Sequence, residues 1–169
     1  MLSALRKAKA VKRPMPDGLE VVLINRVESG SLGAFFSALM GAGDGVFFHP
    51  HPLTPAGAIE RVGYHGIDLY YAVLEGDRIL AYGMLRGWDE GYDIPSLGIA
   101  VHPSERGRGL GEFLMRFLAK AARRRGATSV RLTVDESNLR AIALYRRLGY
   151  DFQAFKTGSL LGLLQLHDE

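Results

Sequence analysis

The sequence predicts an α+β domain in which a mixed, mostly antiparallel sheet of about seven strands is combined with four helices. Short runs rich in β-branched and aromatic residues alternate with helical repeats, and several runs follow one another directly, as antiparallel strands do. One strand–helix–strand crossover, over residues 96–134, requires a parallel pair inside that sheet. A chain of 169 residues is long enough for one domain with a sizeable core.

The first half of the domain is predicted to hold a strand, two helices and a hairpin. Apolar residues repeat at helical spacing around Phe35 and Phe36. Thr54 followed by Pro55 is a typical N-cap and first-turn pair, which opens a second helix. The sequence Glu75-Gly76-Asp77 is a turn signal between two β-rich runs. The expected elements are a strand over 19–27, helices over 31–40 and 54–63, and strands over 68–74 and 78–86.

In the second half, a strand is expected directly before a glycine- and arginine-rich turn, and a strongly periodic helix directly after it. That helix is expected to end at Gly126, which follows a basic last turn. Another strand, a last helix and a closing pair of strands follow. These elements are expected over residues 96–101, 110–125, 129–134, 138–148, 150–156 and 160–166. Residues 1–17 are expected to form a basic, flexible lead, and residues 18–169 a single domain.

The composition excludes several classes of protein. The chain has no cysteine, which rules out a disulfide framework, a thiolate zinc site and a cysteine nucleophile. No apolar run is long enough to cross a membrane and no signal-peptide core is present, so we expect a cytoplasmic protein without a membrane partner. The net charge is +3. A frayed basic tail and cations at a helix C-terminus explain the basic clusters more simply than nucleic-acid binding, and we expect no nucleic-acid partner.

Residues 101–111 (VHPSERGRGLG) join the strand to the periodic helix. Unpaired N–H groups and the positive end of the helix dipole make a helix start an anion site. Glycine lets that backbone approach a bulky phosphate, and Arg106 and Arg108 add positive charge. The G-x-G-x-G spacing differs from that of dinucleotide-binding folds, and no P-loop lysine follows. The pattern predicts a diphosphate cradle; the alternative is a tight turn with solvated arginines.

Arg106, Gly109 and Gly111 form the pattern Arg-x-x-Gly-x-Gly, which resembles the coenzyme A pyrophosphate loop of the GNAT family of N-acyltransferases. Residues 138–150 (NLRAIALYRRLGY) resemble the family's second motif, Asn-x-x-Ala-x-x-Leu-Tyr-x-x-x-Gly-aromatic. The two motifs occur in the family's order, with a strand between them. The close resemblance covers residues 96–150, and the rest of the chain agrees in the order of its elements.

The resemblance implies the GNAT acyl-CoA N-acyltransferase fold, with the sheet splayed at its parallel pair. It implies an N-acetyltransferase that uses acetyl-CoA as cosubstrate, without a metal, and moves the acetyl group to a primary amine by direct attack in a ternary complex. The amides of Ile99 and Val101 would meet the thioester and pantetheine, and Tyr145 would protonate the departing thiolate. Asn138 would contact the pantetheine arm or the substrate. The diphosphate would be bound by Arg106, Gly107, Arg108, Gly109, Leu110 and Gly111. On spacing alone, Tyr145 could equally be a packed aromatic residue and Asn138 a helix cap.

One departure from the family concerns the general base. Many members carry a Glu about where Ser96 stands, which helps to deprotonate the amine through water. An ammonium with a pKa of about 10.4 must lose a proton before attack, at a cost of roughly 4–5 kcal/mol at pH 7. Another base or a water chain must therefore serve. The candidates are His49, His51, Glu75, Asp89, Glu90 and Asp93. His102, beside the cradle, is expected to be a surface residue at the strand end.

The segment His49-Pro50-His51-Pro52 joins the two early helices, which in this family border the acceptor pocket. Two imidazoles two residues apart could share a metal ion, but no third ligand stands at a fixed offset, so loop histidines are the better interpretation. With Phe47, Phe48 and Trp88, this segment is our hypothesis for acceptor choice. We expect a small-molecule amine or amino sugar as acceptor. A protein or peptide amine, and a non-catalytic domain that senses coenzyme A or scaffolds a partner, are the alternatives, and a homodimer stays open.

Overall fold

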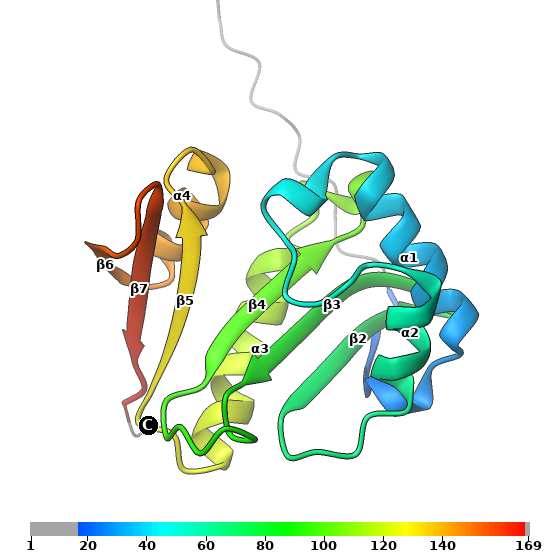
Figure 1. Cartoon of the computed structure of the whole chain (residues 1–169), viewed down its shortest axis with the longest axis horizontal. Coiled ribbons are helices and arrows are strands. Elements are labelled where there is room, and N and C mark those ends of the chain that lie inside the picture. Colours follow the sequence, from blue (N-terminus) through cyan, green and yellow to red (C-terminus); the bar gives the residue numbers. More distant parts are fainter. Residues whose placement is uncertain (1–16, 168–169) are drawn as a thin grey trace, which may run out of the picture.

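Seven strands form one sheet in the computed structural model, which describes residues 17–167 (Figure 1). They are β1 (Glu20–Leu23), β2 (Leu69–Glu75), β3 (Arg78–Arg86), β4 (Ser96–Val101), β5 (Ser129–Asp135), β6 (Asp151–Ala154) and β7 (Ser159–Gln165). Their order is β1-β2-β3-β4-β5-β7-β6, and every neighbouring pair is antiparallel except β4 and β5. The mixed, mostly antiparallel sheet predicted from the sequence is confirmed. The predicted basic lead lies, apart from Asp17, outside the described residues.

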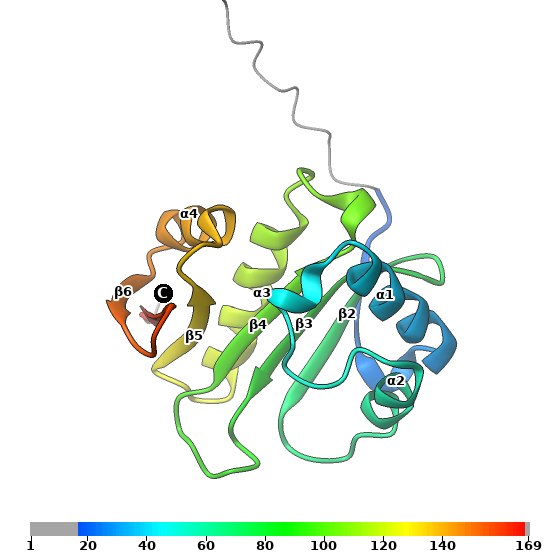
Figure 2. The same ribbon diagram turned by 45° about the horizontal axis from the view of Figure 1, so that its top comes forward.

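Helices cover both faces of this sheet (Figures 1 and 2). Between Asp17 and His167 they are α1 (Ser29–Gly41), α2 (Pro55–Val62), α3 (Leu110–Arg124) and α4 (Leu139–Arg147), with 3-10 turns η1 (Ile24–Arg26), η2 (Asp44–Val46) and η3 (Pro103–Glu105). Helices α1 and α2 lie on one face, and α3 lies on the other, behind β3 and β4. Thr54 caps α2 as predicted, since its hydroxyl oxygen accepts a hydrogen bond from the Gly57 N–H at 3.0 Å.

Each face of the sheet has its own apolar core. On the α1 face, Phe35 and Phe36 are 2% and 0% exposed and pack against Tyr82 of β3. On the other face, Leu114 and Leu118 of α3 are fully buried against the sheet. Burial of one such side chain contributes about 1.5–3 kcal/mol, so these two layers fix the sheet between the helices. No helix of residues 17–167 has the length and apolar composition that crossing a bilayer requires.

The first strand is shorter than the sequence predicts. Pairing with β2 ends at Leu23, opposite Tyr71, and η1 follows where the predicted strand would continue to residue 27. Ile24 and Val27 are only 3% and 8% exposed, because they turn into the core under α1. The apolar run therefore reflects burial, and only its first part joins the sheet.

The parallel strands β4 and β5 separate almost at once. Among the described residues one pair is in register, Ser96 opposite Arg131, and the Arg131 N–H donates to the Pro95 carbonyl at 3.0 Å. Beyond Ser96 the two strands diverge toward α4 (Figure 1). The splay that the family resemblance implies is present.

The edge of β4 that faces this gap has unused hydrogen-bond donors. The His102 N–H donates to the Leu80 carbonyl of β3 at 2.8 Å. Donors alternate between the two sides of an antiparallel strand, so the N–H groups of Ile99 and Val101 point away from β3. They face β5, which has already diverged at that level.

Candidate active site

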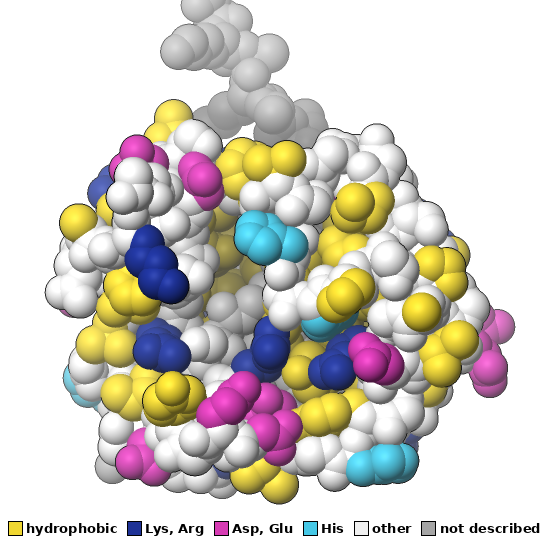
Figure 3. All heavy atoms as spheres, in the orientation of Figure 1, with side chains coloured by type: hydrophobic (Ala, Val, Ile, Leu, Met, Phe, Trp, Pro, Cys, Tyr) yellow, Lys and Arg dark blue, Asp and Glu magenta, His cyan; other side chains and the backbone are white. Residues whose placement is uncertain are grey.

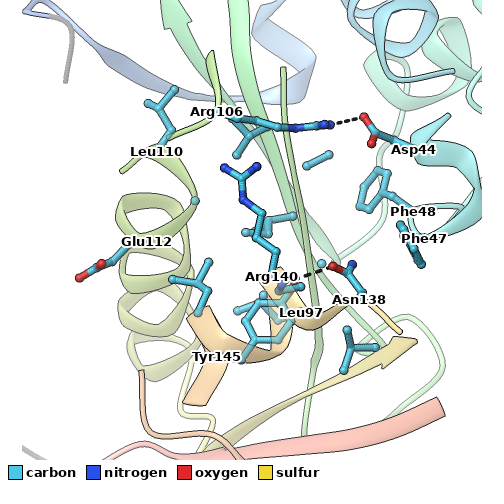
Figure 4. A pocket seen from close by; sticks show the side chains of 18 of the residues that line it. Asp44, Phe47, Phe48, Leu97, Arg106, Leu110, Glu112, Asn138, Arg140 and Tyr145 are labelled. Carbon is cyan, nitrogen blue, oxygen red and sulfur yellow. Dashed lines mark hydrogen bonds and ion pairs between the residues drawn. The ribbon is translucent and has the colours of Figure 1, made fainter. Parts of the chain in front are cut away.

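A cavity of about 570 Å³ opens into the gap between β4 and β5. Its walls come from β4, the turn after it, the start of α3, the length of α4, the end of β5, Leu39 of α1 and the segment after α1 (Figure 4). Nine of the ten site residues predicted from the sequence line this cavity. They are Ile99, Val101, Arg106, Gly107, Gly109, Leu110, Gly111, Asn138 and Tyr145. The two sequence motifs are therefore two walls of one cavity.

Two glycines shape the turn at the start of α3. Gly107 and Gly109 have φ angles of 78° and 88°, a region that other residues enter only with strain. Gly109 is the N-cap and has no side chain with which to cap the helix. The helical hydrogen bond from the Phe113 N–H reaches the Gly109 carbonyl at 3.0 Å. The three N–H groups before Phe113 are thus available to an anion at the positive end of the helix dipole.

Gly111 is different, because it lies within the regular helical backbone of α3. A Cβ atom there would meet the side chains of Leu144, Ile99 and Val101 at 3.4, 3.6 and 3.8 Å. These are ordinary van der Waals distances, so the protein itself would accommodate alanine. The missing side chain leaves space at the point where β4, α3 and α4 meet along the cavity.

Arg108 is the one predicted site residue that does not line the cavity. Its guanidinium pairs with Glu105, which is 5% exposed, and Arg78 Nη1 donates to the same carboxylate at 2.8 Å. Burial acts to raise the pKa of Glu105, but hydrogen bonds from Arg78, Arg108 and Ser104 outweigh it and hold the pKa at about 2. Arg108 therefore ties the turn to a buried carboxylate, and its contact with a diphosphate stays a prediction.

Arg106 does line the cavity and reaches across it. Its Nη2 atom pairs with Oδ2 of Asp44 in η2 (Figure 4). The side chains of Arg106 and Asp44 are 33% and 20% exposed. This ion pair joins the glycine-rich turn to the segment between α1 and α2.

Tyr145 lines the cavity from α4, and its ring centroid lies 5.9 Å from that of Tyr150. Burial raises the pKa of Tyr145 to about 12, so the hydroxyl is protonated at neutral pH. No group within residues 17–167 forms a hydrogen bond with this hydroxyl, which leaves its proton for a ligand. The Tyr150 hydroxyl is also buried without a partner in the described chain, but Tyr150 does not line the cavity.

Asn138 both caps α4 and lines the cavity. Its Oδ1 atom accepts a hydrogen bond from the Ala141 N–H at 3.3 Å. The side-chain NH₂ group still offers donors to a ligand. The two interpretations of Asn138 from the sequence are therefore compatible.

Sequence reasoning missed Arg140 in the first turn of α4. Its exposed side chain lines the cavity and extends toward the start of α3 (Figure 4). No carboxylate of the described chain pairs with it. Arg140 occupies a variable position of the second motif, and only the fold shows that this position faces the glycine-rich turn.

None of the six candidate bases lines the cavity. The Nε2 atom of His51 lies 2.9 Å from the Tyr82 hydroxyl in the aromatic core, and burial lowers the pKa of His51 to about 4. Asp89 accepts a hydrogen bond from the Tyr64 hydroxyl, which joins the loop before β4 to the segment after α2. The other candidates are exposed outside the cavity; they are His49, Glu75, Glu90 and Asp93.

Three carboxylates do line the cavity, and each is paired with arginine. Asp44 pairs with Arg106, and Glu105 with Arg78 and Arg108. Glu112 pairs with Arg116 at 3.0 Å and with Arg147 at 3.5 Å. In the part of the chain that the structure describes, the cavity therefore holds no carboxylate without a cationic partner.

The residues of the acceptor hypothesis do not all lie at the cavity. Phe47 and Phe48 line the cavity, whereas Trp88 lies elsewhere, with the Arg125 guanidinium 4.7 Å from its ring centroid. His102 accepts a hydrogen bond from the Ser104 N–H at 3.2 Å and so caps η3. Among residues 17–167 no three potential ligand side chains come together to hold a metal ion.

The sequence matches the acetyltransferase (GNAT) family over residues 45–150, a range that holds both motifs and every cavity residue except Leu39 and Asp44. The chain belongs to the GNAT family. Over 65 residues this GNAT protein is 42% identical to streptothricin acetyltransferase of Streptomyces lavendulae, a match that covers 38% of the chain and 33% of that enzyme.

Solved GNAT structures share the fold. The GNAT domain of PAT from S. lividans superposes with a TM-score of 0.72 at 18% identity, covering 88% of this chain and 89% of that one. The protein yncA from Salmonella typhimurium, solved with its cofactor acetyl-CoA, gives a TM-score of 0.66 at 19% identity over 90% of this chain and 96% of that one.

Proposed function

We propose that this GNAT protein transfers the acetyl group of acetyl-CoA to a primary amine of a small molecule, by direct attack in a ternary complex. The observation that carries the proposal is the gap between β4 and β5. There the N–H groups of Ile99 and Val101 face a cavity that also holds the Tyr145 hydroxyl and the start of α3. A thioester ligand uses these features together: a diphosphate cradle, amide donors along the arm and a donor at the sulfur.

The residues present fit coenzyme A. The backbone of residues 106–111 would hold the diphosphate, and Arg140 would add positive charge from α4. The pantetheine arm would follow β4, with the amides of Ile99 and Val101 and the Asn138 side chain as partners. The splay supports this fit, because a fully paired strand would have no donors left for a ligand.

Acetyl-CoA supplies, when bound, an acetyl group activated as a thioester. The Ile99 N–H would donate to the carbonyl oxygen, where negative charge develops as the amine attacks. Tyr145 has a pKa of about 12. It is therefore a weaker acid than a thiol, with a pKa of about 8.5, and donates a hydrogen bond to the sulfur until the leaving group carries charge. Tyr145 would give its proton to the departing thiolate and would regain one, directly or through water, from the attacking nitrogen, which loses its proton as the amide forms, so the tyrosine ends unchanged.

The amine must reach the cavity without its extra proton. The cavity carboxylates are paired with arginines, and Ser96 directs its hydroxyl oxygen to the Arg131 Nε at 3.0 Å. We therefore infer that water, rather than a protein carboxylate, accepts the proton of the ammonium. A small-molecule amine fits a cavity of this size, and the relatedness to an acetyltransferase that acts on streptothricin favours that class over a protein or peptide.

Calorimetric titration with acetyl-CoA, followed by thiol-release assays over a panel of primary amines, tests the proposal. We expect micromolar binding and turnover with at least one amine. Binding without turnover on any amine would favour a domain that senses coenzyme A. Absence of binding would overturn the proposed function.

A further inference from the structure

We propose that the acceptor carries an anionic group, a carboxylate or a phosphate, which Arg86 and Arg131 bind at the narrow end of the gap between β4 and β5. This inference rests on the proposed function and names the class of acceptor.

The two arginines stand in one row across the sheet. Arg86 of β3 is opposite Ser96 of β4, and Ser96 is opposite Arg131 of β5. Residues in register share a face of the sheet, so both guanidinium groups lie on the face that carries α1 and α2. Neighbouring strands are about 4.8 Å apart, which puts the two Cα atoms about 10 Å apart with only a serine between them.

Arg86 has donors that the described chain leaves unused. Its Nη1 atom donates to the Pro50 carbonyl at 2.7 Å, while its Nε–H group is buried and has no hydrogen-bond partner in residues 17–167. A buried donor without a partner destabilises the folded protein, so an anion that reached Arg86 would relieve this cost. No carboxylate of the described chain lies within ion-pair distance of Arg86.

Arg131 is held in place but not neutralised. Its Nε–H group donates to the Ser96 hydroxyl oxygen at 3.0 Å, and its guanidinium carbon lies 5.5 Å from the centroid of the Tyr92 ring. Arg131 lines a second pocket, beside β6 and β7, together with Asp93 and Asp151, yet neither carboxylate forms an ion pair with Arg131 in the described structure. The terminal NH₂ groups of this side chain are thus free to form charge-assisted bonds with a ligand.

The surroundings of Arg86 are positive as well. Arg61 of α2 lies 4.8 Å from the centroid of the Tyr70 ring, and its Nε–H group also has no partner in the described chain. Burial lowers the pKa of His51, the nearby charges of Arg61 and Arg86 lower it further, and the carboxylate of Glu60 acts in the opposite direction. In Figure 3, basic side chains border the lower end of a hollow in this face, and acidic side chains gather below them.

The row formed by Arg86, Ser96 and Arg131 lies close to the active-site cavity along β4. Ser96 is two residues before Gly98, which lines the cavity, and strand residues advance by about 3.3 Å each. The Cα atom of Ser96 is therefore roughly 7 Å along the strand from that of Gly98 at the cavity. Small amines with one anionic group, such as short amino acids and phosphorylated amines, are the class of acceptor that this placement predicts. An aminoglycoside, whose several ammonium groups would meet the arginines, is expected to be a poor acceptor.

Pairs of acceptors that have similar shapes but differ in an anionic group show whether the charge of the acceptor matters. The carboxylate arm compares β-alanine with β-alaninamide; the phosphate arm compares O-phosphoethanolamine with ethanolamine and glucosamine 6-phosphate with glucosamine. We expect kcat/KM to be at least about tenfold higher for the anionic member of one arm. Which arm shows the preference identifies the anionic group. Equal or higher values for the neutral members of all pairs would overturn the inference.

Variants locate the effect. Arg131→Gln and Arg86→Gln should lower kcat/KM for the preferred anionic acceptor about 10- to 100-fold, chiefly through KM, and change it less than about threefold for the neutral partner. Arg131→Lys should keep part of the preference. Lys120→Gln, on the exposed side of α3, removes the same charge elsewhere and should change neither. Equal losses on both members of a pair would mean a structural role and contradict the inference.

A binding measurement covers the case of slow turnover. β-Alanine and O-phosphoethanolamine are titrated calorimetrically into the protein saturated with coenzyme A. Binding of either anion that is lost in Arg131→Gln supports the inference, and binding of neither overturns it. If instead the proposed function were wrong, titration with acetyl-CoA alone would already produce no heat, so the two failures can be told apart.

Discussion

Arg106 in the glycine-rich turn and Asp44 in η2 form an ion pair across 62 positions of the sequence. Arg106 belongs to the turn that would bind the diphosphate of coenzyme A, whereas Asp44 lies just before Phe47 and Phe48, which are expected to contact the acceptor. A phosphate at the start of α3 would compete with Asp44 for the same guanidinium. The two ligands would thereby be linked through one side chain.

Asp44→Asn should therefore tighten the binding of acetyl-CoA. The substitution frees Arg106 and removes a negative charge from the cavity, and pairs of this exposure contribute up to about 1 kcal/mol, which corresponds to about fivefold in Kd. Calorimetric titration measures the change, with Glu75→Gln on the exposed hairpin as the control for charge alone. Weaker binding in Asp44→Asn would mean that the pair positions Arg106 instead of competing for it.

Gly111→Ala should weaken acetyl-CoA binding without weakening the fold. The added Cβ makes only ordinary contacts of 3.4 Å or more with protein atoms, and alanine favours helix by up to about 1 kcal/mol relative to glycine. The same Cβ would occupy space that the ligand needs, so we expect Kd to rise at least about tenfold at unchanged or higher melting temperature. Gly30→Ala, at the second position of α1 with no atom within 4 Å, is the matched control. Unchanged Kd in Gly111→Ala would place the diphosphate elsewhere.

Tyr145→Phe should lower kcat by about 10²-fold or more and leave KM for acetyl-CoA nearly unchanged, because it removes a proton donor and keeps the ring. The hydroxyl has no partner in the described chain, so thermal unfolding should show little change. Tyr150→Phe, in the neighbouring ring, removes a buried hydroxyl that also lacks a partner and should leave kcat as it is. Equal effects of the two substitutions on kcat would remove the proposed role of Tyr145.

The pH dependence of the rate should follow the protonation of the acceptor amine rather than that of a group on the protein. With the cavity carboxylates paired, the fraction of neutral amine sets kcat/KM, and for an amine with a pKa of about 10.4 it rises about tenfold per pH unit between pH 7 and 9. Initial rates at saturating acetyl-CoA measure this slope for two amines of different pKa. A limb near pH 6–7 that stays fixed when the amine is changed would reveal a protein base.

The stability of the fold should fall as His51 becomes protonated. Burial lowers the pKa of His51 in the folded protein to about 4, from an ordinary value of 6.5. The neutral form is therefore favoured by folding: this contribution is complete above pH 6.5 and is lost as the pH falls from 6.5 through 4. Urea unfolding at pH 7, 5.5 and 4 should show a shallower decline in His51→Gln than in the parent protein. His49→Gln, an exposed neighbour, should follow the parent curve.

Local signals in the sequence account for the elements that were predicted. The glycine turn before α3, the Thr54–Pro55 start of α2 and the hairpin at Gly76 are all set by residues next to one another, and the structure has them where expected. Nine of the ten predicted site residues line one cavity for the same reason: each motif keeps its own geometry, and the crossover brings the two motifs together.

What the sequence did not predict depends on register and packing between distant segments. The pairing of Arg106 with Asp44, the approach of Arg140 to the start of α3 and the row of Arg86 and Arg131 arise only when strands and helices are placed side by side. The early end of β1 has the same origin. An apolar residue such as Ile24 suits both a strand and the core, and only packing in the folded protein shows that it leaves the sheet.

Because β4 and β5 share a single in-register pair, the sheet consists of two halves, β1–β4 and β5–β7, that meet at one short seam. Opening of that seam breaks few backbone bonds, so the amide hydrogens of β4 and β5 that face each other across it should exchange with solvent more readily than those of the continuous ladders β2–β3 and β5–β7. A pantetheine arm lying in the seam would act as a missing strand. Its arrival should slow exchange on both half-sheets together and turn two cooperative units into one.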